Sequence, residues 1–263
     1  MNFTSIQYTM TDSIAYLTLN RPEVHNAFDD VMISEILAAL AEVRGNAAIR
    51  ALVLQANGKS FSAGADLAWM RSMAAKDYAE NIADATQLSR LMQELDELPI
   101  PTIALVQGAA FGGAVGLIAC CDLAFATSNS SFCLSEVKIG LIPAVISPYV
   151  MRAMGTRQAR RYMLTAERFD AHTAQQVGLI HQVVDSFTET LTPLLQQLLG
   201  NSPAAMAAAK ALALQVDQQP LVAATRQFTI EQIAATRVSS EGQEGLTAFL
   251  EKRPPQWTLK SST

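Results

Sequence analysis

The chain has 263 residues, of which 50% are hydrophobic and 16% are charged, and its formal net charge is −5. That much apolar material excludes intrinsic disorder as the general state, and the acidic balance excludes a dominant basic field for nucleic acid. Cys120, Cys121 and Cys133 are too few and too clustered for a disulfide framework, which favours a reducing compartment. The N-terminal stretch has no charged segment followed by an unbroken apolar run, so it does not predict a signal peptide.

The first half of the chain alternates between patterns typical of strands and of helices. Strands are predicted over residues 14–19, 49–54, 102–107, 123–127 and 131–134, and helices from about 26, over 77–98 and from 113. From Ser147 to about Glu251 the pattern is helical, apart from turns near 155, 178–184 and 200–203. This order predicts an α/β core followed by a C-terminal helical extension.

Residues 98–121 are uncharged and long enough to span a bilayer. They also contain Pro99, Pro101 and four glycines, which divide the stretch into short pieces. We interpret the stretch as a buried strand, a glycine turn and a buried helix. The sequence therefore predicts a protein without a membrane span, located in the cytoplasm.

Two short segments each follow a predicted strand and lead into a predicted helix. They are FSAGADL at residues 61–67 and GAAFGGA at residues 108–114. Backbone N–H groups at the start of a helix have no partner inside that helix. Two such groups that converge on one point would stabilise negative charge developing on a carbonyl oxygen. The alternative is that both segments are only tight strand-to-helix turns.

One carboxylate stands among apolar residues in the segment FCLSEVKIGLIP, at residues 132–143. Such surroundings predict that Glu136 is partly desolvated, has a raised pKa and is able to shuttle a proton. The apolar neighbours are Val137, Ile139, Leu141 and Ile142. The alternative is that Glu136 caps a helix or forms an ion pair on the surface.

Together these segments resemble the crotonase superfamily, also called enoyl-CoA hydratase/isomerase. The resemblance runs from about Ile14 to Gln256, in the order and spacing of that family. It is carried by LNRP at 19–22, the two glycine segments, CDLAFA at 121–126, SEVKIGLIP at 135–143, LTAERFD at 164–170 and EGQEGLTAFLEKRPP at 241–255. It implies an α/β fold: a crotonase-type spiral of ββα units over residues 1–200, with the acyl-CoA site, and a C-terminal helical region over 201–263 that builds a trimer or hexamer.

The resemblance also implies where the parts of an acyl-CoA substrate lie. The backbone N–H groups of Ala65 and Gly113 match the oxyanion hole for the thioester oxygen, and Glu136 matches a catalytic glutamate. Positions that match coenzyme A contacts are Arg21, Val24, Ala63, Asp66 and Leu67 and, from a neighbouring subunit, Phe249 and Lys252. Coenzyme A is part of the substrate here, so no separate cofactor is implied.

The sequence departs from the hydratases of this superfamily at one catalytic position. Those enzymes usually carry a second glutamate three residues after the second oxyanion glycine, and here that position is Gly116. One carboxylate is enough to shift a double bond, so an enoyl-CoA isomerase is the first alternative to a hydratase. A non-catalytic scaffold that binds acyl-CoA or RNA is the second alternative.

Within the superfamily, GAAFGGAVGL followed by SEVKIGLIPAVISPYV most resembles bacterial methylglutaconyl-CoA hydratases of leucine degradation. Similar sequences act on the isohexenyl analogue in acyclic terpene breakdown. The resemblance predicts hydration of 3-methylglutaconyl-CoA to 3-hydroxy-3-methylglutaryl-CoA. The distal carboxylate of that substrate needs a cationic or hydrogen-bonding partner, and the candidates are Arg71, Lys138, Tyr149 and Arg152.

Two other groups of residues do not predict a site. The histidines His25, His172 and His181 are scattered without the spacing of metal ligands, so no metal is expected. Five arginines between residues 152 and 168 favour a solvated helix face or a subunit contact. The acidic balance of the whole chain argues against an RNA partner.

Overall fold

The computed structural model describes residues 3–217 and 219–258. The chain divides into two compact units. The first unit comprises Met1–Leu98 and Thr102–Thr190, and the second comprises Pro99–Pro101 and Leu191–Thr263. The division near residue 190 falls inside helix α8 (Phe187–Gly200). The boundary expected from the sequence, between residues 200 and 201, lies at the end of this helix.

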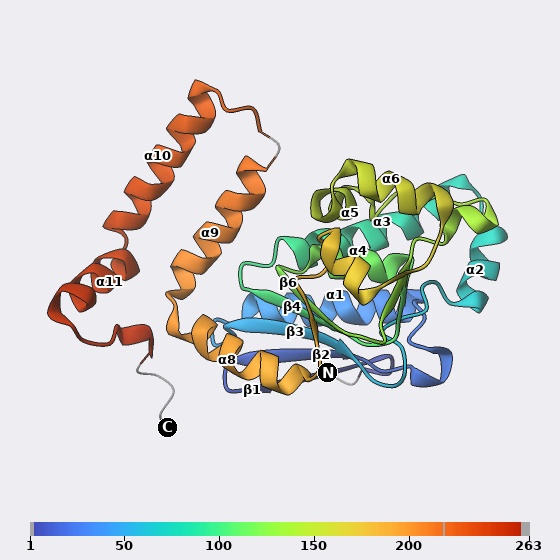
Figure 1. Ribbon diagram of the computed structural model, residues 1–263, viewed down its shortest axis with the longest axis horizontal. Coiled ribbons are helices and arrows are strands. Elements are labelled where there is room, and N and C mark those ends of the chain that lie inside the picture. The colour runs from blue at the N-terminus through green and yellow to red at the C-terminus, as the bar shows by residue number, and fades with distance from the viewer. Residues whose placement is uncertain (1–2, 218, 259–263) are drawn as a thin grey trace. The chain divides into compact units, whose positions relative to one another are not determined.

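The main sheet of the first unit has six strands in the order β1-β2-β3-β4-β6-β9. β1 (Ile6–Thr11) is antiparallel to β2 (Ile14–Leu19), and parallel pairing continues through β3 (Ala51–Ala56), β4 (Thr102–Val106), β6 (Leu123–Thr127) and β9 (Gln182–Val184). Every residue of β4 is buried, as expected for a central strand of a parallel sheet. Helices α1 (Asp30–Gly45), α3 (Tyr78–Asp96) and α4 (Gly113–Cys120) lie along one side of these strands (Figure 1).

A second, three-stranded sheet has the order β5-β7-β8. β5 (Ala109–Phe111) is parallel to β7 (Ser131–Cys133), and β7 is antiparallel to β8 (Phe169–Asp170). Its core face is aromatic: the ring centroid of Phe169 lies 5.5 Å from that of Phe132 and 4.1 Å from that of Tyr162. The strand β5 leads into Gly112 and Gly113, and β7 leads into the segment with Glu136. Pairing of β5 with β7 therefore brings these glycines and Glu136 together.

The first unit is completed by α2 (Leu67–Ala74), α5 (Ser147–Met154), α6 (Thr156–Thr165), α7 (Ala171–Gln176) and two 3-10 turns, η1 (Pro22–Val24) and η2 (Glu136–Ile139). The second unit is helical, with α9 (Pro203–Val216), α10 (Ala223–Val238), α11 (Ser240–Glu251) and η3 (Gln256–Thr258). Within it, the guanidinium of Arg253 contacts both oxygens of Glu244, at 2.7 and 3.0 Å. The expected α/β core and C-terminal helical region are thus both present.

Most predicted elements of the core are confirmed, with corrections. The strands β1, β5 and β8 were not predicted, and β9 lies in a stretch interpreted as a turn. The helix expected from Asn26 begins at Asp30, because Asn26 has a φ of +53° and Asp29 caps the helix by accepting from the Met32 N–H. Residues 98–121 contain β4, β5 and α4, and in the part of the chain that the structure describes no helix has the length and apolarity to cross a membrane.

Candidate active site

The first glycine segment runs beside β5 and is hydrogen-bonded to it. The Ser62 N–H donates to the Ala109 oxygen at 3.0 Å, and the Phe111 N–H donates to the Ser62 oxygen at 3.0 Å. Gly64 has a φ of +94°, and a Cβ atom there would lie 3.1 Å from the Phe111 oxygen. Glycine is therefore required at Gly64 both by the backbone conformation and by the close approach of β5.

On its other side the same segment forms a parallel bridge with Phe28. The Phe28 N–H donates to the Gly64 oxygen at 2.7 Å, and the Asp66 N–H donates to the Phe28 oxygen at 2.8 Å. In this pattern the residue opposite Phe28, which is Ala65, directs its own N–H away from Phe28. The Ala65 N–H therefore faces the side on which residues 109–113 lie.

The second N–H group belongs to the first residue of α4. Gly112, with a φ of +55°, turns the chain from β5 into the helix, and its own N–H donates to the Cys133 oxygen at 2.9 Å. Gly113 follows as the first helical residue, so its N–H has no partner within the helix. Among residues 3–217 and 219–258, neither the Gly113 N–H nor the Ala65 N–H donates to a protein acceptor.

Glu136 lies against this turn. Phe111 pairs with Cys133 in the small sheet, and the chain continues from Cys133 to Glu136 at the start of η2. A Cβ atom on Gly112 would lie 3.2 Å from Oε1 of Glu136, so the missing side chain leaves room for the carboxylate. The other carboxylate oxygen, Oε2, is buried and has no hydrogen-bond partner within the described residues.

Burial raises the pKa of Glu136 above its ordinary value, against the weaker opposing effect of its own backbone N–H. This agrees with the predicted direction and with desolvation as its cause. Of the four apolar neighbours in sequence, Ile139, Leu141 and Ile142 are exposed in this chain and Val137 is half-buried. The carboxylate lies against the Gly112 turn, and its Oε2 is buried.

Gly116 has no space for a second acid. It is buried on α4, and a Cβ atom there would lie 2.3 Å from Cγ2 and 2.7 Å from Cβ of Ile146, and 3.2 Å from Sδ of Met92. Ile146 is only 2% exposed. The volume next to Gly116 is therefore filled by an aliphatic side chain rather than by a carboxylate from another segment.

We expect Gly116→Ala to destabilise the protein by about 1–3 kcal/mol, because the added methyl group overlaps Ile146 in a packed core. Chemical unfolding measures this loss. Gly45→Ala is the matched control, since Gly45 ends α1 and a Cβ atom there meets nothing within 4 Å. A Gly116→Ala variant as stable as the wild type would contradict the packing described here.

The residues expected to contact coenzyme A differ in what their side chains do. Val24, Ala63 and Leu67 are exposed. The side chains of Arg21 and Asp66 are bonded to each other, with Nη2 3.1 Å from Oδ2, and Asp66 also caps α2. Both therefore already have protein partners.

The two coenzyme A positions expected from a neighbouring subunit lie in the second unit. Phe249 on α11 is 82% exposed. Lys252 ends that helix in the left-handed conformation, with a φ of +54°. Neither residue is buried by its own unit, which leaves both side chains available to another molecule.

The four candidates for a distal carboxylate also differ. Arg152 forms an ion pair with Asp96, and its guanidinium lies 5.6 Å from the Tyr149 ring centroid. Burial raises the pKa of Tyr149 to about 12, so its hydroxyl stays protonated at neutral pH. Arg71 and Lys138 are exposed, and no ion pair is formed by either with another described residue.

Comparison with known proteins identifies the family. The family described as Enoyl-CoA hydratase/isomerase matches residues 9–260. The chain belongs to this family. A solved structure of an enoyl-CoA hydratase from Shewanella pealeana is 54% identical to this family member. The match covers 97% of this chain and 96% of the Shewanella chain, with a TM-score of 0.96.

Two curated relatives of the family extend over nearly the same length. Crotonyl-CoA hydratase of Syntrophomonas wolfei is 31% identical, over 99% of this chain and 100% of its own. 2,3-Dehydroadipyl-CoA hydratase of Escherichia coli is 33% identical, over 93% of this chain and 94% of its own. The chain is therefore an enzyme of the enoyl-CoA hydratase type.

Proposed function

We propose that the enzyme adds water across the 2,3 double bond of 3-methylglutaconyl-CoA and forms 3-hydroxy-3-methylglutaryl-CoA. One observation carries the proposal. The carboxylate of half-buried Glu136, whose buried Oε2 has no hydrogen-bond partner in the part of the chain that the structure describes, lies against the turn that presents the Gly113 N–H, and the Ala65 N–H faces the same side. A proton shuttle beside two free N–H donors suits the addition of water to an unsaturated thioester.

In the proposed reaction the two N–H groups bind the thioester oxygen. Attack by water at C3 moves negative charge onto that oxygen as an enolate forms, and donors already in place stabilise the charge without reorganising. Backbone donors held by glycine turns are suited to this role because the surrounding hydrogen bonds fix them. The interaction strengthens as the charge grows, so it lowers the barrier rather than only binding the substrate.

Glu136 handles the proton in this scheme. Its carboxylate accepts a proton from the attacking water while the water oxygen bonds to C3. The resulting carboxylic acid then donates a proton to C2 as the enolate collapses, which returns the carboxylate to its starting state. Because Ile146 fills the space beside Gly116, a single carboxylate performs both transfers.

The choice of a dicarboxylic substrate rests on resemblance and on one relative. The sequence segments around Gly113 and Glu136 resemble methylglutaconyl-CoA hydratases, and the relative named for 2,3-dehydroadipyl-CoA is named for an enoyl-CoA with a distal carboxylate. Lys138 lies on the same 3-10 turn as Glu136, and Arg71 lies on α2, which follows Ala65. We propose these two cations as partners of the distal carboxylate, since Arg152 is already paired with Asp96.

A second candidate activity is supported by the packing around Gly116. A double-bond isomerase needs one group that removes a proton and returns it to another carbon, and Glu136 alone satisfies that requirement. The absence of room for a carboxylate at Gly116 is compatible with such an enzyme. The two reactions differ in mass, because only hydration adds water.

The deciding experiment offers the purified enzyme 3-methylglutaconyl-CoA, crotonyl-CoA and a 3-enoyl-CoA side by side and follows the products by mass. We expect water gain on the glutaconyl ester and much less on crotonyl-CoA, and Lys138→Met should reduce that preference. Equal hydration of both esters would contradict the dicarboxylic substrate. A mass-neutral change of the 3-enoyl ester without water gain on any ester would establish the isomerase instead.

We also propose that coenzyme A lies along Val24, Ala63, Asp66 and Leu67.

We propose further that the active enzyme is a trimer or hexamer in the cytoplasm. The exposed large apolar side chains of the second unit support an assembly, because burying them would be favourable. They include Leu221, Ile230, Ile233, Leu246, Phe249 and Leu250. Light scattering of the purified protein measures the assembly, and a monomer at micromolar concentration would contradict it.

A further inference from the structure

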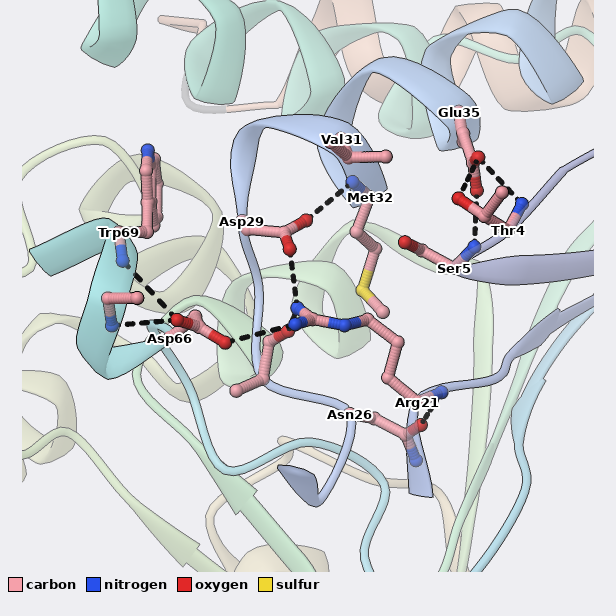
Figure 2. Close-up of polar contacts among 12 residues, drawn as sticks. Thr4, Ser5, Arg21, Asn26, Asp29, Val31, Met32, Glu35, Asp66 and Trp69 are labelled. Atoms are coloured by element: carbon pink, nitrogen blue, oxygen red, sulfur yellow. Dashed lines mark hydrogen bonds and ion pairs between the residues drawn. The ribbon is translucent and has the colours of Figure 1, made fainter. Parts of the chain in front are cut away.

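The guanidinium of Arg21 joins two carboxylates from different parts of the first unit. Nη1 lies 2.6 Å from Oδ2 of Asp29 and donates to the Ala27 oxygen at 2.9 Å. Nη2 lies 3.1 Å from Oδ2 of Asp66. Figure 2 shows the Arg21 side chain reaching between Asp29 and Asp66. All three side chains are at most 20% exposed, so solvent screens these ion pairs less than it screens surface pairs.

Each of the two carboxylates uses its second oxygen to cap a helix. Oδ1 of Asp29 accepts from the Met32 N–H at 2.8 Å at the start of α1. Oδ1 of Asp66 accepts from the N–H groups of Ala68 and Trp69 at the start of α2. Burial opposes the charge of Asp66, but these donors and the Arg21 cation outweigh it and lower its pKa. Arg21 thus fixes the starts of two helices relative to each other.

Phe28 lies between those two helix starts and next to both residues that supply the proposed oxyanion donors. It precedes Asp29, and its backbone forms the bridge on either side of Ala65. Its ring lies beside Gly113, where an added Cβ atom would be 3.7 Å from Cδ2 of Phe28. Phe28 is 3% exposed, so its ring has little freedom to move. The ion pairs of Arg21 therefore hold the segment around Phe28, which lies beside both Ala65 and Gly113.

The backbone of Arg21 is itself held in place. The Arg21 N–H donates to Oδ1 of Asn26 at 2.7 Å, and the Arg21 oxygen accepts from the Asn26 N–H at 2.8 Å. Nδ2 of the fully buried Asn26 donates to the oxygens of Asn57 and Ser60, at 2.8 and 2.9 Å. Ser60 leads directly into the first glycine segment. The backbone of Arg21 is therefore anchored, through Asn26, to Ser60 at the start of the first glycine segment. Its guanidinium is bonded to Asp66 near the end of that segment.

We propose that Arg21 is a positioning residue that sets the distance between the N–H groups of Ala65 and Gly113. It acts through Asp29 and Asp66, and its guanidinium does not bind the phosphates of coenzyme A. The inference rests on the proposed role of those two N–H groups as the oxyanion hole. It assigns to Arg21 an effect on turnover rather than on affinity for coenzyme A.

The test uses Arg21→Lys, which keeps the charge but replaces the two guanidinium nitrogens, each placed on its own carboxylate, with a single nitrogen. Asp29→Asn is the second variant, because asparagine still caps α1 and only the ion pair is lost. Arg44→Gln is the matched control, since it removes an ion pair between Arg44, at the other end of α1, and Glu94 on α3. The probe is butyryl-CoA labelled with ¹³C at the thioester carbonyl, which binds without being hydrated. Difference infrared spectra of the full-length enzyme record the carbonyl frequency, and calorimetry records the affinity for free coenzyme A.

In the wild type we expect the carbonyl frequency to fall on binding. Arg21→Lys and Asp29→Asn should lose most of that shift and about 100-fold in kcat, because small misplacements of reacting groups have effects of that size. Affinity for free coenzyme A should stay the same. If both variants keep the shift, or if Arg21→Lys loses affinity for coenzyme A but keeps the shift, Arg21 is not a positioning residue. If the wild type itself shows no shift, the proposed oxyanion hole fails and the inference fails with it.

Discussion

Glu136→Gln is expected to lower kcat by about 100-fold or more, with a much smaller change in KM. Glutamine keeps the shape of the side chain beside Gly112 but cannot accept or return a proton. Steady-state kinetics on the best enoyl-CoA substrate measure the effect. Glu42→Gln, an exposed position on α1, is the control and should behave like the wild type. Turnover of Glu136→Gln near that of the wild type would exclude Glu136 as the proton shuttle.

The pH dependence of the same reaction follows from the raised pKa of Glu136. A general base works when deprotonated, so kcat/KM should fall as the pH drops through that pKa. The fall should occur above pH 4.3, about where an unperturbed glutamate titrates. It should be missing from the residual activity of Glu136→Gln. A fall that persists unchanged in this variant would assign the titration to another group.

Protein stability gives an independent measure of the same burial. Since the folded state raises the pKa of Glu136, it binds the proton more tightly than the unfolded chain does. The resulting stabilisation is complete below the unfolded pKa and is lost as the pH rises through the folded pKa. Glutamine does not titrate, so the stability of Glu136→Gln relative to the wild type should increase from about pH 4 to pH 7. Urea unfolding at several pH values checks the sign.

Local patterns were sufficient to predict the parts of the site that lie at strand ends. Both glycine segments follow strands and lead into helices, and the predicted strands 102–107 and 131–134 are β4 and β7. Pairing of β5 with β7 then brings Gly112 and Glu136 together. The strand β8 was missed because its two residues carry no readable period, and β9 was missed because it follows Gly178 in a stretch interpreted as a turn.

Side chains that act across the fold could not be predicted in the same way. Ile146 fills the space beside Gly116 from a segment 30 positions away, and nothing in either local sequence indicates that contact. Phe28 appears in the sequence as an ordinary helix-entry residue, yet it touches both oxyanion segments. For Asp66 the signal was available, since an aspartate just before a helix is a common N-cap.

Gly113→Pro is expected to lower kcat by about 100- to 1,000-fold, because it removes one of the two proposed oxyanion donors. Proline is tolerated at the first position of a helix, where its missing N–H costs no helical hydrogen bond. Gly113 occupies that position in α4. The substitution therefore removes the donor while leaving the helix intact. Steady-state kinetics measure the loss, and circular dichroism and chemical unfolding verify the fold.

Gly113→Ala adds a Cβ atom at the same position and keeps the donor, so it measures the effect of that added atom alone. A Cβ atom on Gly113 would meet the Phe28 ring at 3.7 and 3.9 Å, which is ordinary van der Waals contact, and the N–H remains. Alanine should therefore lose far less activity than proline. Equal losses in both variants would show that bulk at this position, rather than the hydrogen bond, limits turnover. Full activity of Gly113→Pro would show that the Gly113 N–H is not part of the oxyanion hole. The Ala65 N–H would then have no second donor beside it.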